Sequence, residues 1–192
     1  MRVRVSWVGA GPPNHVSTWA LGLFALLLGT FVFTRLVYVD KPDHMFDAER
    51  AERAGLVVDE MSVGEEPIRL AHSRLDIGQA KDIFDNAGDT LIRGLEANPF
   101  VLDFDFSRPQ AVRGLAMDFG RMDFVLRVQV YGTDSSKPIF YQGEYRQQPD
   151  IPHIDMDFAN GPEQVKRVVI EIEQLNPPNE VHIHVREVLF KQ

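Results

Sequence analysis

The feature of this sequence that most limits its fold is a regular alternation of apolar and polar residues in its second half. In VLDFDF (101–106), the leucine and both phenylalanines fall on one side of an extended chain and both aspartates fall on the other. The same two-residue period recurs in FVLRVQVY (124–131), IDMDF (154–158), VKRVVIEIE (165–173) and VHIHVREVLF (181–190). Because successive side chains of a strand point to opposite faces, the alternation predicts a series of half-buried β-strands.

Turn-rich stretches separate these strands and indicate how they connect. Proline, glycine, asparagine and serine gather at SRPQ (107–110), GTDSSKP (132–138), QQPDIP (147–152), ANGPEQ (159–164) and NPPNE (176–180). LAMDF (115–119) and PIFYQGEY (138–145) add two weaker strand candidates. About seven short strands at this spacing favour an all-β fold, an antiparallel, jelly-roll-like β-sandwich, over a parallel α/β sheet.

A different pattern lies near the N-terminus. Val16–Thr34, VSTWALGLFALLLGTFVFT, contains no charged residue. At about 1.5 Å per helical residue, a run of this length nearly crosses the ~30 Å hydrocarbon core of a bilayer. Trp19 and Tyr38 bracket the run, as amphipathic rings do at the two membrane interfaces. We therefore expect one transmembrane helix, residues 18–39, before the sandwich.

The charges on either side of this run predict its orientation. Arg2 and Arg4 precede it, whereas Asp40, Lys41 and Asp43 follow it. The positive-inside rule then puts the N-terminus in the cytoplasm and the C-terminal domain outside it. The alternative, a cleaved signal peptide, would have a shorter apolar region and a small-residue cleavage site. We expect an uncleaved, single-pass membrane protein.

These patterns divide the chain of 192 residues into four parts. The expected parts are a short cytoplasmic tail (1–17), the transmembrane helix (18–39), a stalk or linker (40–75) and the β-sandwich (76–192). Within the stalk, FDAERAERAG has a potential N-cap at Asp47 and a stop signal at Gly55, which predicts one or two helical turns. A second short helical candidate lies around Ile77–Phe84.

Charge and cysteine content exclude several classes of function. All 28 acidic residues but only 17 of the 20 Lys and Arg residues lie in 40–192, so this part has a formal charge of −11. Such acidity argues against binding to nucleic acid or to anionic lipid headgroups. The absence of cysteine excludes disulfides, thiol catalysis and cysteine-based zinc sites. With no nucleophile turn and no phosphate-binding loop, we predict that the protein is not an enzyme.

Three stretches carry a family resemblance. The first is IFDNAGDTLIR (83–93), which looks like a loop with the pattern FDG-x-x-x-T-x-W. The second is NPFVLDFDFSRPQAVRGLAMDFG (98–120), which looks like an aromatic-rich strand, a proline turn and a second strand. The third is VHIHVREVLF (181–190), which looks like a closing strand with a glutamate. Together they resemble the galactose-binding-domain-like β-sandwiches, which include discoidin domains and many carbohydrate-binding modules, over Ala80–Lys191. Ile92 departs from the pattern, since the family often has tryptophan there. The resemblance implies a β-sandwich that binds a glycan.

The resemblance also implies one structural calcium ion, held between this loop and the closing strand by Asp85, Asp89, Thr90 and Glu187. Calcium takes 6–8 oxygen ligands, often from a tight loop, and DNAGDT supplies carboxylates, a hydroxyl and flexible backbone. Glu187 has the parity of the apolar residues in its strand, and a carboxylate on an apolar face is costly unless it is paired or bound to metal. The alternatives are an ordinary Asp/Asn/Gly turn and a bulge near Arg186 that turns Glu187 to solvent.

Two other groups of polar residues have simpler interpretations. His182 and His184, with His153 as a third imidazole, would suit zinc, but pairing with Glu171 and Glu173 across a hairpin is the more economical explanation. Carboxylates two residues apart in EIE, DFD and DMD would suit glycoside hydrolysis only if they flanked a cleft. On regular strand faces they indicate ordinary sheet surface.

Phe140, Tyr141, Tyr145 and Arg146 are the sequence's candidates for a recognition surface, because aromatic faces beside arginine suit sugar rings or protein contacts. Core or cross-strand packing is the alternative. Two functions stay open at this point. One is a non-catalytic, membrane-tethered sandwich that binds a glycan or another envelope ligand. The other is a structural or accessory subunit of a membrane protein complex, docking through its helix and its sandwich.

Overall fold

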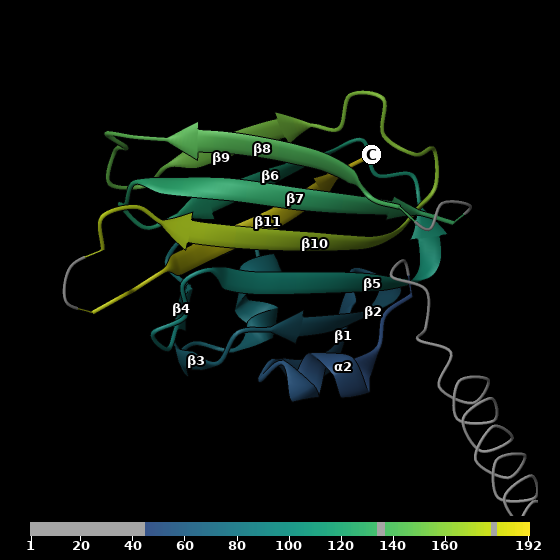
Figure 1. Cartoon of the computed structure of the whole chain (residues 1–192), viewed down its shortest axis with the longest axis horizontal. Helices are drawn as coiled ribbons and strands as arrows, with labels where there is room; N and C mark the ends of the chain where they lie inside the picture. Colours follow the sequence, from purple (N-terminus) through teal and green to yellow (C-terminus); the bar gives the residue numbers. More distant parts are fainter. Residues whose placement is uncertain (1–44, 134–136, 178–179) are drawn as a thin grey trace, which may run out of the picture. The chain divides into compact units, whose positions relative to one another are not determined.

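The computed structural model describes residues 45–133, 137–177 and 180–192, which form an antiparallel sandwich of two β-sheets (Figure 1). One sheet has six strands, in the order β1 (Val57–Val63), β2 (Glu66–His72), β5 (Phe100–Gln110), β10 (Val165–Gln174), β7 (Phe124–Gly132) and β8 (Ile139–Tyr145). The other has five, in the order β3 (Leu75–Ile77), β4 (Ile92–Gly94), β11 (His184–Lys191), β6 (Gly114–Phe119) and β9 (His153–Asp157). The predicted all-β, antiparallel sandwich is confirmed.

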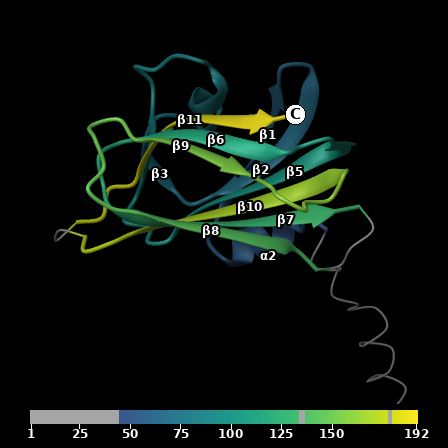
Figure 2. The same cartoon turned by 90° about the horizontal axis from the view of Figure 1, so that it is seen from above.

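The hydrophobic core lies between the two sheets, which Figure 2 shows from above. Alternate residues of the central strands supply it, as the two-residue period predicts; fully buried examples are Phe100, Leu102, Phe104, Leu126, Val128, Ile170 and Ile172. Phe104 meets the rings of Phe84 and Phe190 edge to face, with centroids 5.9 and 5.1 Å apart. The contact with Phe190 joins β5 of one sheet to β11 of the other.

The predicted stalk, residues 40–75, is wrong over most of its length. The strands β1 and β2 form a hairpin, and β2 pairs with β5, so this segment is one side of the six-stranded sheet. Ile68 and Leu70 are buried in the main core. The alternation was hard to recognise because β1 is an edge strand, which buries few of its side chains, and β2 includes Pro67.

The helical turns predicted from FDAERAERAG are present as α2 (Ala48–Arg53). A side-chain oxygen of Asp47 accepts the backbone N–H of Arg50 at 3.2 Å and so caps the helix. Gly55, with a φ of +82°, ends it. The second helical candidate is a 3₁₀ helix, Ala80–Phe84.

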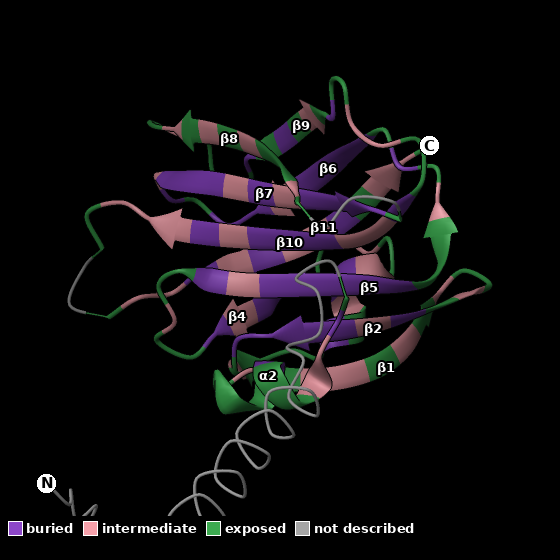
Figure 3. Ribbon diagram, turned by 45° about the vertical axis from the view of Figure 1, so that its right-hand side comes forward, coloured by how far each residue is buried: buried purple, intermediate pink, exposed green. Residues whose placement is uncertain are grey.

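The helix α2 covers part of the outer face of the six-stranded sheet, away from the core (Figure 3). Phe46 and Ala51 pack there against Ala71 of β2, in a small cluster separate from the main core. Leu70, the neighbour of Ala71, points the opposite way into the core. The strand β2 is thus buried on both faces, although the sequence predicts a linker there.

Two ion pairs lie on the same outer face. Arg167 donates to both oxygens of Asp103, at 2.7 Å each, and Arg69 donates to Asp105 at 3.1 and 2.6 Å. Both aspartates are buried. The guanidinium of Arg69 also lies 4.9 Å from the centre of the Phe46 ring. The segment before and within α2 therefore closes over charged groups as well as apolar ones.

The expected transmembrane helix, residues 18–39, and the expected tail, residues 1–17, lie outside the described residues. Within the described ranges, which start at residue 45, no helix has the length and apolar character needed to cross a membrane.

Candidate functional site

One end of the sandwich gathers loops from both sheets. This loop end consists of residues 95–99, 120–123, 146–152, 175–177 and 180–183, which connect β4 to β5, β6 to β7, β8 to β9 and β10 to β11. Backbone hydrogen bonds hold the loops together. Leu175 donates to the carbonyl of Asp123 at 2.8 Å, and Gly120 donates to that of His184 at 3.1 Å. Because of these hydrogen bonds, the loops support one another and form one surface.

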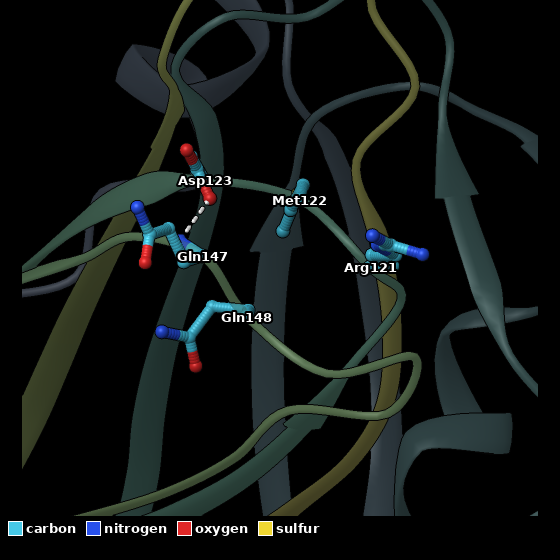
Figure 4. Close-up of a pocket in the computed structure, with 5 residues that line it drawn as sticks. All are labelled: Arg121, Met122, Asp123, Gln147 and Gln148. Carbon is cyan, nitrogen blue, oxygen red and sulfur yellow. Dashed lines mark hydrogen bonds between the residues drawn. The ribbon is translucent and has the colours of Figure 1, made fainter.

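A depression of about 490 Å³ opens at the loop end, lined by Arg121, Met122, Asp123, Gln147 and Gln148 (Figure 4). The backbone N–H of Gln147, a residue with a φ of +53°, donates to the Asp123 carboxylate at 2.7 Å and ties the two lining loops together. The side-chain amide of Gln148 donates to the Arg146 carbonyl at 2.8 Å, which leaves its side-chain oxygen as an acceptor.

The chemistry of this depression is polar around a small apolar floor. It offers a guanidinium, a carboxylate and two primary amides, together with the buried thioether side chain of Met122. Arg121 is held by an exposed ion pair with Asp150 at 3.2 Å. Paired donors and acceptors of this kind match the hydroxyl groups of a sugar. Sequence reasoning missed these residues because they come from two turn-rich loops separated by the β7–β8 hairpin.

The structure divides the four predicted recognition residues between two environments. Phe140 points to the outer face of β8 and is 68% exposed. Tyr141 and Tyr145 point the other way and stack on Phe158 and Phe124, with centroids 4.9 and 5.1 Å apart. Burial raises the pKa of both tyrosine hydroxyls. The core-packing alternative therefore describes the tyrosines, and no single aromatic surface results.

Arg146, the fourth of these residues, pairs with its neighbour Glu144 at 2.5 Å on the surface. Its backbone carbonyl accepts the Gln148 amide, so Arg146 borders the depression through its main chain. Tyr145 and Arg146 thus lie at the loop end, whereas Phe140 and Tyr141 lie towards the other end of β8, and a different group of residues lines the depression.

Three of the four predicted calcium ligands come together. A side-chain oxygen of Asp85 accepts the Thr90 hydroxyl and the Ala87 N–H, each at 2.9 Å. Burial and the nearby Asp85 charge raise the pKa of Glu187. Two carboxylates that repel each other beside a hydroxyl fit a divalent cation. Asp89 is exposed and has no hydrogen bond or ion pair with the other three among the described residues.

Side chains alone do not complete a metal site here. Over the described ranges, no group of three or more histidine and carboxylate side chains is placed to hold a metal ion. A calcium ion bound to Asp85, Thr90 and Glu187 would need backbone carbonyls as further ligands. Candidates are those of Asp82 and Ala87, both of which already face the Thr90 hydroxyl, at 3.4 and 2.7 Å.

The orientation of Glu187 differs from the one predicted by parity. A β-bulge between Val185 and Glu187 adds one residue to β11. Val185 and Val188 both point into the core, whereas Leu189 is exposed. The bulge shifts the alternation by one residue, so Glu187 leaves the apolar face without needing a metal.

The histidines and the paired acids do not form a metal or hydrolytic centre. His153 lies on β9 with its Nδ1 2.6 Å from Asp118, in a different group from His182 and His184. The DFD acids are the buried partners of Arg69 and Arg167, and both DMD acids contact Lys191. In EIE, Glu173 pairs with Arg127 at 2.6 Å.

Comparisons with known proteins bear on the fold. No family model matches the chain, and no curated protein sequence does either. A solved structure of GH31 CBM32-2 bound to GalNAc matches with a TM-score of 0.50 and 14% identity, over 67% of this chain and 99% of that one. A Ruminococcus gnavus GH29 fucosidase in complex with fucose matches with a TM-score of 0.50 and 9% identity, over 65% of this chain.

The chain spans only 25% of the length of that fucosidase. At these identities the likeness concerns the fold alone. It confirms the fold that the sequence resemblance implied, a β-sandwich like those of CBM32 carbohydrate-binding modules.

Proposed function

We propose that this protein is a non-catalytic glycan-binding module, with its ligand site in the depression formed by 121–123 and 147–148. The observation that carries the proposal is the cluster of polar side chains at the loop end of the sandwich. The neighbour bound to GalNAc, which has the same fold, supports a sugar as the ligand. In this reading Arg121, Asp123 and Gln148 hydrogen-bond sugar hydroxyls, and Met122 contacts an apolar patch of the ring.

The site would bind without reacting. Asp123 is committed to the backbone of Gln147, and the lining holds no second carboxylate that could act with it as an acid–base pair. We further propose that residues 18–39 tether the module to a membrane with the sandwich outside the cytoplasm. Removal of residues 1–41 should then release the protein from the membrane fraction.

The glycan site is tested by titrating the purified full chain, in mild detergent, with the positive glycans from an array screen. Gln148→Ala should weaken binding about three- to tenfold, the cost of one hydrogen bond. Gln142→Ala is the matched control, because Gln142 is exposed on β8 and does not line the depression. Binding to no glycan, or equal affinity of both variants, would overturn the proposal.

A second function is favoured by the edge strand β8. Phe140 and Ile139 are exposed apolar side chains at the edge of the six-stranded sheet, and such edges suit contact with another protein. On this view the protein is an accessory subunit of a membrane complex. Purification from native membranes in mild detergent should then yield a stoichiometric partner that Phe140→Ala releases, and recovery of a lone monomer would count against it.

We also propose that Asp85, Thr90 and Glu187 hold a structural calcium ion, with backbone carbonyls completing the shell. The repulsion between the two carboxylates supports it, because a divalent cation would relieve that repulsion. The ion would fix the loop 85–90 against β11 and take no part in any reaction.

A further inference from the structure

Three buried nitrogen atoms without a hydrogen-bond partner lie along one short stretch of chain. They are Nδ1 of His182, Nε2 of His184 and Nε of Arg186. These residues are alternate positions entering β11, on the side of the five-stranded sheet that faces away from the core. A buried polar atom without a partner costs about 1–3 kcal/mol. Three such atoms leave this stretch of chain with hydrogen-bonding capacity that its own neighbours do not use.

The charges around these atoms favour an anion. Arg93 of β4 is the direct partner of His184 in the sheet. Burial lowers the pKa of His184, and the charges of Arg93, His182 and Arg186 lower it further. Four basic side chains therefore lie together at this point of a chain whose net charge is −8.

Two acids face the cluster, and both are committed to partners. Asp76 binds Arg93, with oxygen–nitrogen distances of 2.5 to 3.0 Å. Glu180 lies 3.2 Å from Nε2 of His182. Arg186 donates to the carbonyl of Gly88 and forms no ion pair within the described part of the chain. Arg186 and His184 thus form no hydrogen bond or ion pair with a carboxylate in the part of the chain that the structure describes, although the charge of Asp76 acts on His184.

The cluster borders the proposed sugar site. His184 lies against Gly120, where a methyl group would come within 2.8 Å of its Cβ and Nδ1. Gly120 therefore permits this close approach, and the next residue, Arg121, lines the depression. A saccharide of a few residues could place one ring in the depression and a substituent on the cluster.

We propose that Arg93, His182, His184 and Arg186 form a subsite for the acidic group, carboxylate or sulfate, of an anionic glycan. The inference rests on the proposed glycan-binding function and names the class of glycan. Because an imidazole donates from both nitrogens only when protonated, the bound anion draws protons onto the histidines. Affinity for the acidic glycan rises as the pH falls, and affinity for a neutral glycan does not.

The test compares a galacturonate trisaccharide with a neutral galactose trisaccharide, using the full chain in mild detergent at pH 5.5 and 7.5. The acidic sugar should bind at least tenfold more tightly at pH 5.5 than at pH 7.5. His184→Gln should remove most of this difference and leave the neutral sugar unaffected. His153→Gln is the matched control, because His153 is exposed on the same sheet in a different group.

Two further measurements distinguish a carboxylate from a sulfate as the preferred acidic group and guard against a misfolded variant. Arg186→Gln should weaken the acidic sugar about tenfold on its own. Titration of the unaltered protein with inorganic sulfate, followed by the NMR signals of His182 and His184, should shift both. A sulfated trisaccharide that binds better than the galacturonate would identify sulfate as the preferred group.

The outcomes distinguish this inference from the glycan proposal itself. If the neutral sugar binds and the acidic one gains nothing at pH 5.5, the subsite is wrong and the glycan site stands. Failure of both sugars and of every glycan on the array to bind overturns both proposals. Equal effects of His184→Gln and His153→Gln would also overturn the subsite.

Discussion

The outer faces of the two sheets carry the same sequence motif in opposite environments. In DFD of β5, the side chains of Asp103 and Asp105 are 8% and 1% exposed, beneath the segment that contains α2. In DMD of β9, the side chains of Asp155 and Asp157 are 58% and 81% exposed. An alternation of acid and apolar residues is thus compatible with either a covered or an open face.

This difference distinguishes charges that are buried in ion pairs from charges that are exposed to solvent. Burial raises the pKa of Asp103 even though Arg167 hydrogen-bonds to it, so desolvation outweighs pairing at that carboxyl. On the open sheet the balance is reversed, because the hydrogen bonds of Lys191 to Asp155 and Asp157 outweigh desolvation and raise the pKa of Lys191. The two aspartates of β5 are therefore buried in ion pairs, whereas the two aspartates of β9 are open to solvent.

The largest effect is expected at the covered face. Arg167→Met leaves Asp103 buried without its partner and should destabilise the protein by about 3–5 kcal/mol. Urea unfolding measures the change. Lys191→Met, which removes the pairs of the open face, should shift the unfolding midpoint much less, because solvent screens those pairs.

A double variant sharpens this result. Combining Arg167→Met with Asp103→Val removes both buried charges, and it should recover most of the stability lost in Arg167→Met alone. Equal costs for Arg167→Met and Lys191→Met would contradict the contrast between the two faces.

An intermediate effect is expected where α2 covers the sheet. Phe46→Ala removes a buried ring that packs on Ala71 and lies beneath Arg69, which should cost about 2 kcal/mol. Hydrogen exchange should speed up in 45–56 and in β1 more than in β7. Uniform loss of protection through both sheets would mean that α2 is part of one cooperative unit with the core.

The smallest effect is expected at Glu187 on the open face. Its folded-state pKa is raised, so its contribution to stability is present below its ordinary pKa and is lost as the pH rises through the folded value. Without calcium, Glu187→Gln should raise the melting temperature slightly at pH 7 and leave it unchanged at pH 3. Because the side chain is only partly buried, solvent screening keeps the gain below about 1 kcal/mol.

Calcium should reverse the sign of this effect. At 100 times its dissociation constant, a bound ion stabilises the unaltered protein by about 2.7 kcal/mol. Glu187→Gln should lose most of that gain, as calorimetry with calcium and with a chelator would reveal. A melting temperature that does not respond to calcium in either protein would contradict the proposed calcium site.

Local pattern was sufficient to predict the central strands and the sandwich. The buried residues of β5, β7 and β10 follow the two-residue period, because each of these strands has one face on the core. The period failed at two places. The edge strand β1 buries few side chains and looked like part of a stalk, and the bulge at Arg186 reversed the parity of Glu187 and Leu189.

The candidate site was less predictable than the fold. The predicted set of Phe140, Tyr141, Tyr145 and Arg146 rested on aromatic content, and the structure turned both tyrosines towards the core. The depression depends instead on Asp123 and Gln147, which touch through one hydrogen bond between loops far apart in the sequence. No local pattern marks such a contact.

The sequence by itself determined the all-β class, the antiparallel arrangement and the positions of the turns, because these follow from side-chain period and backbone preference over a few residues. Tertiary structure alone decided which outer face is covered, where β11 bulges and which loops meet at one end. Those outcomes depend on how strands distant in sequence pair, and pairing sets the solvent exposure of each charge. Aspartates in the same sequence motif can therefore be buried in an ion pair or exposed to solvent, and only the packing around them decides which.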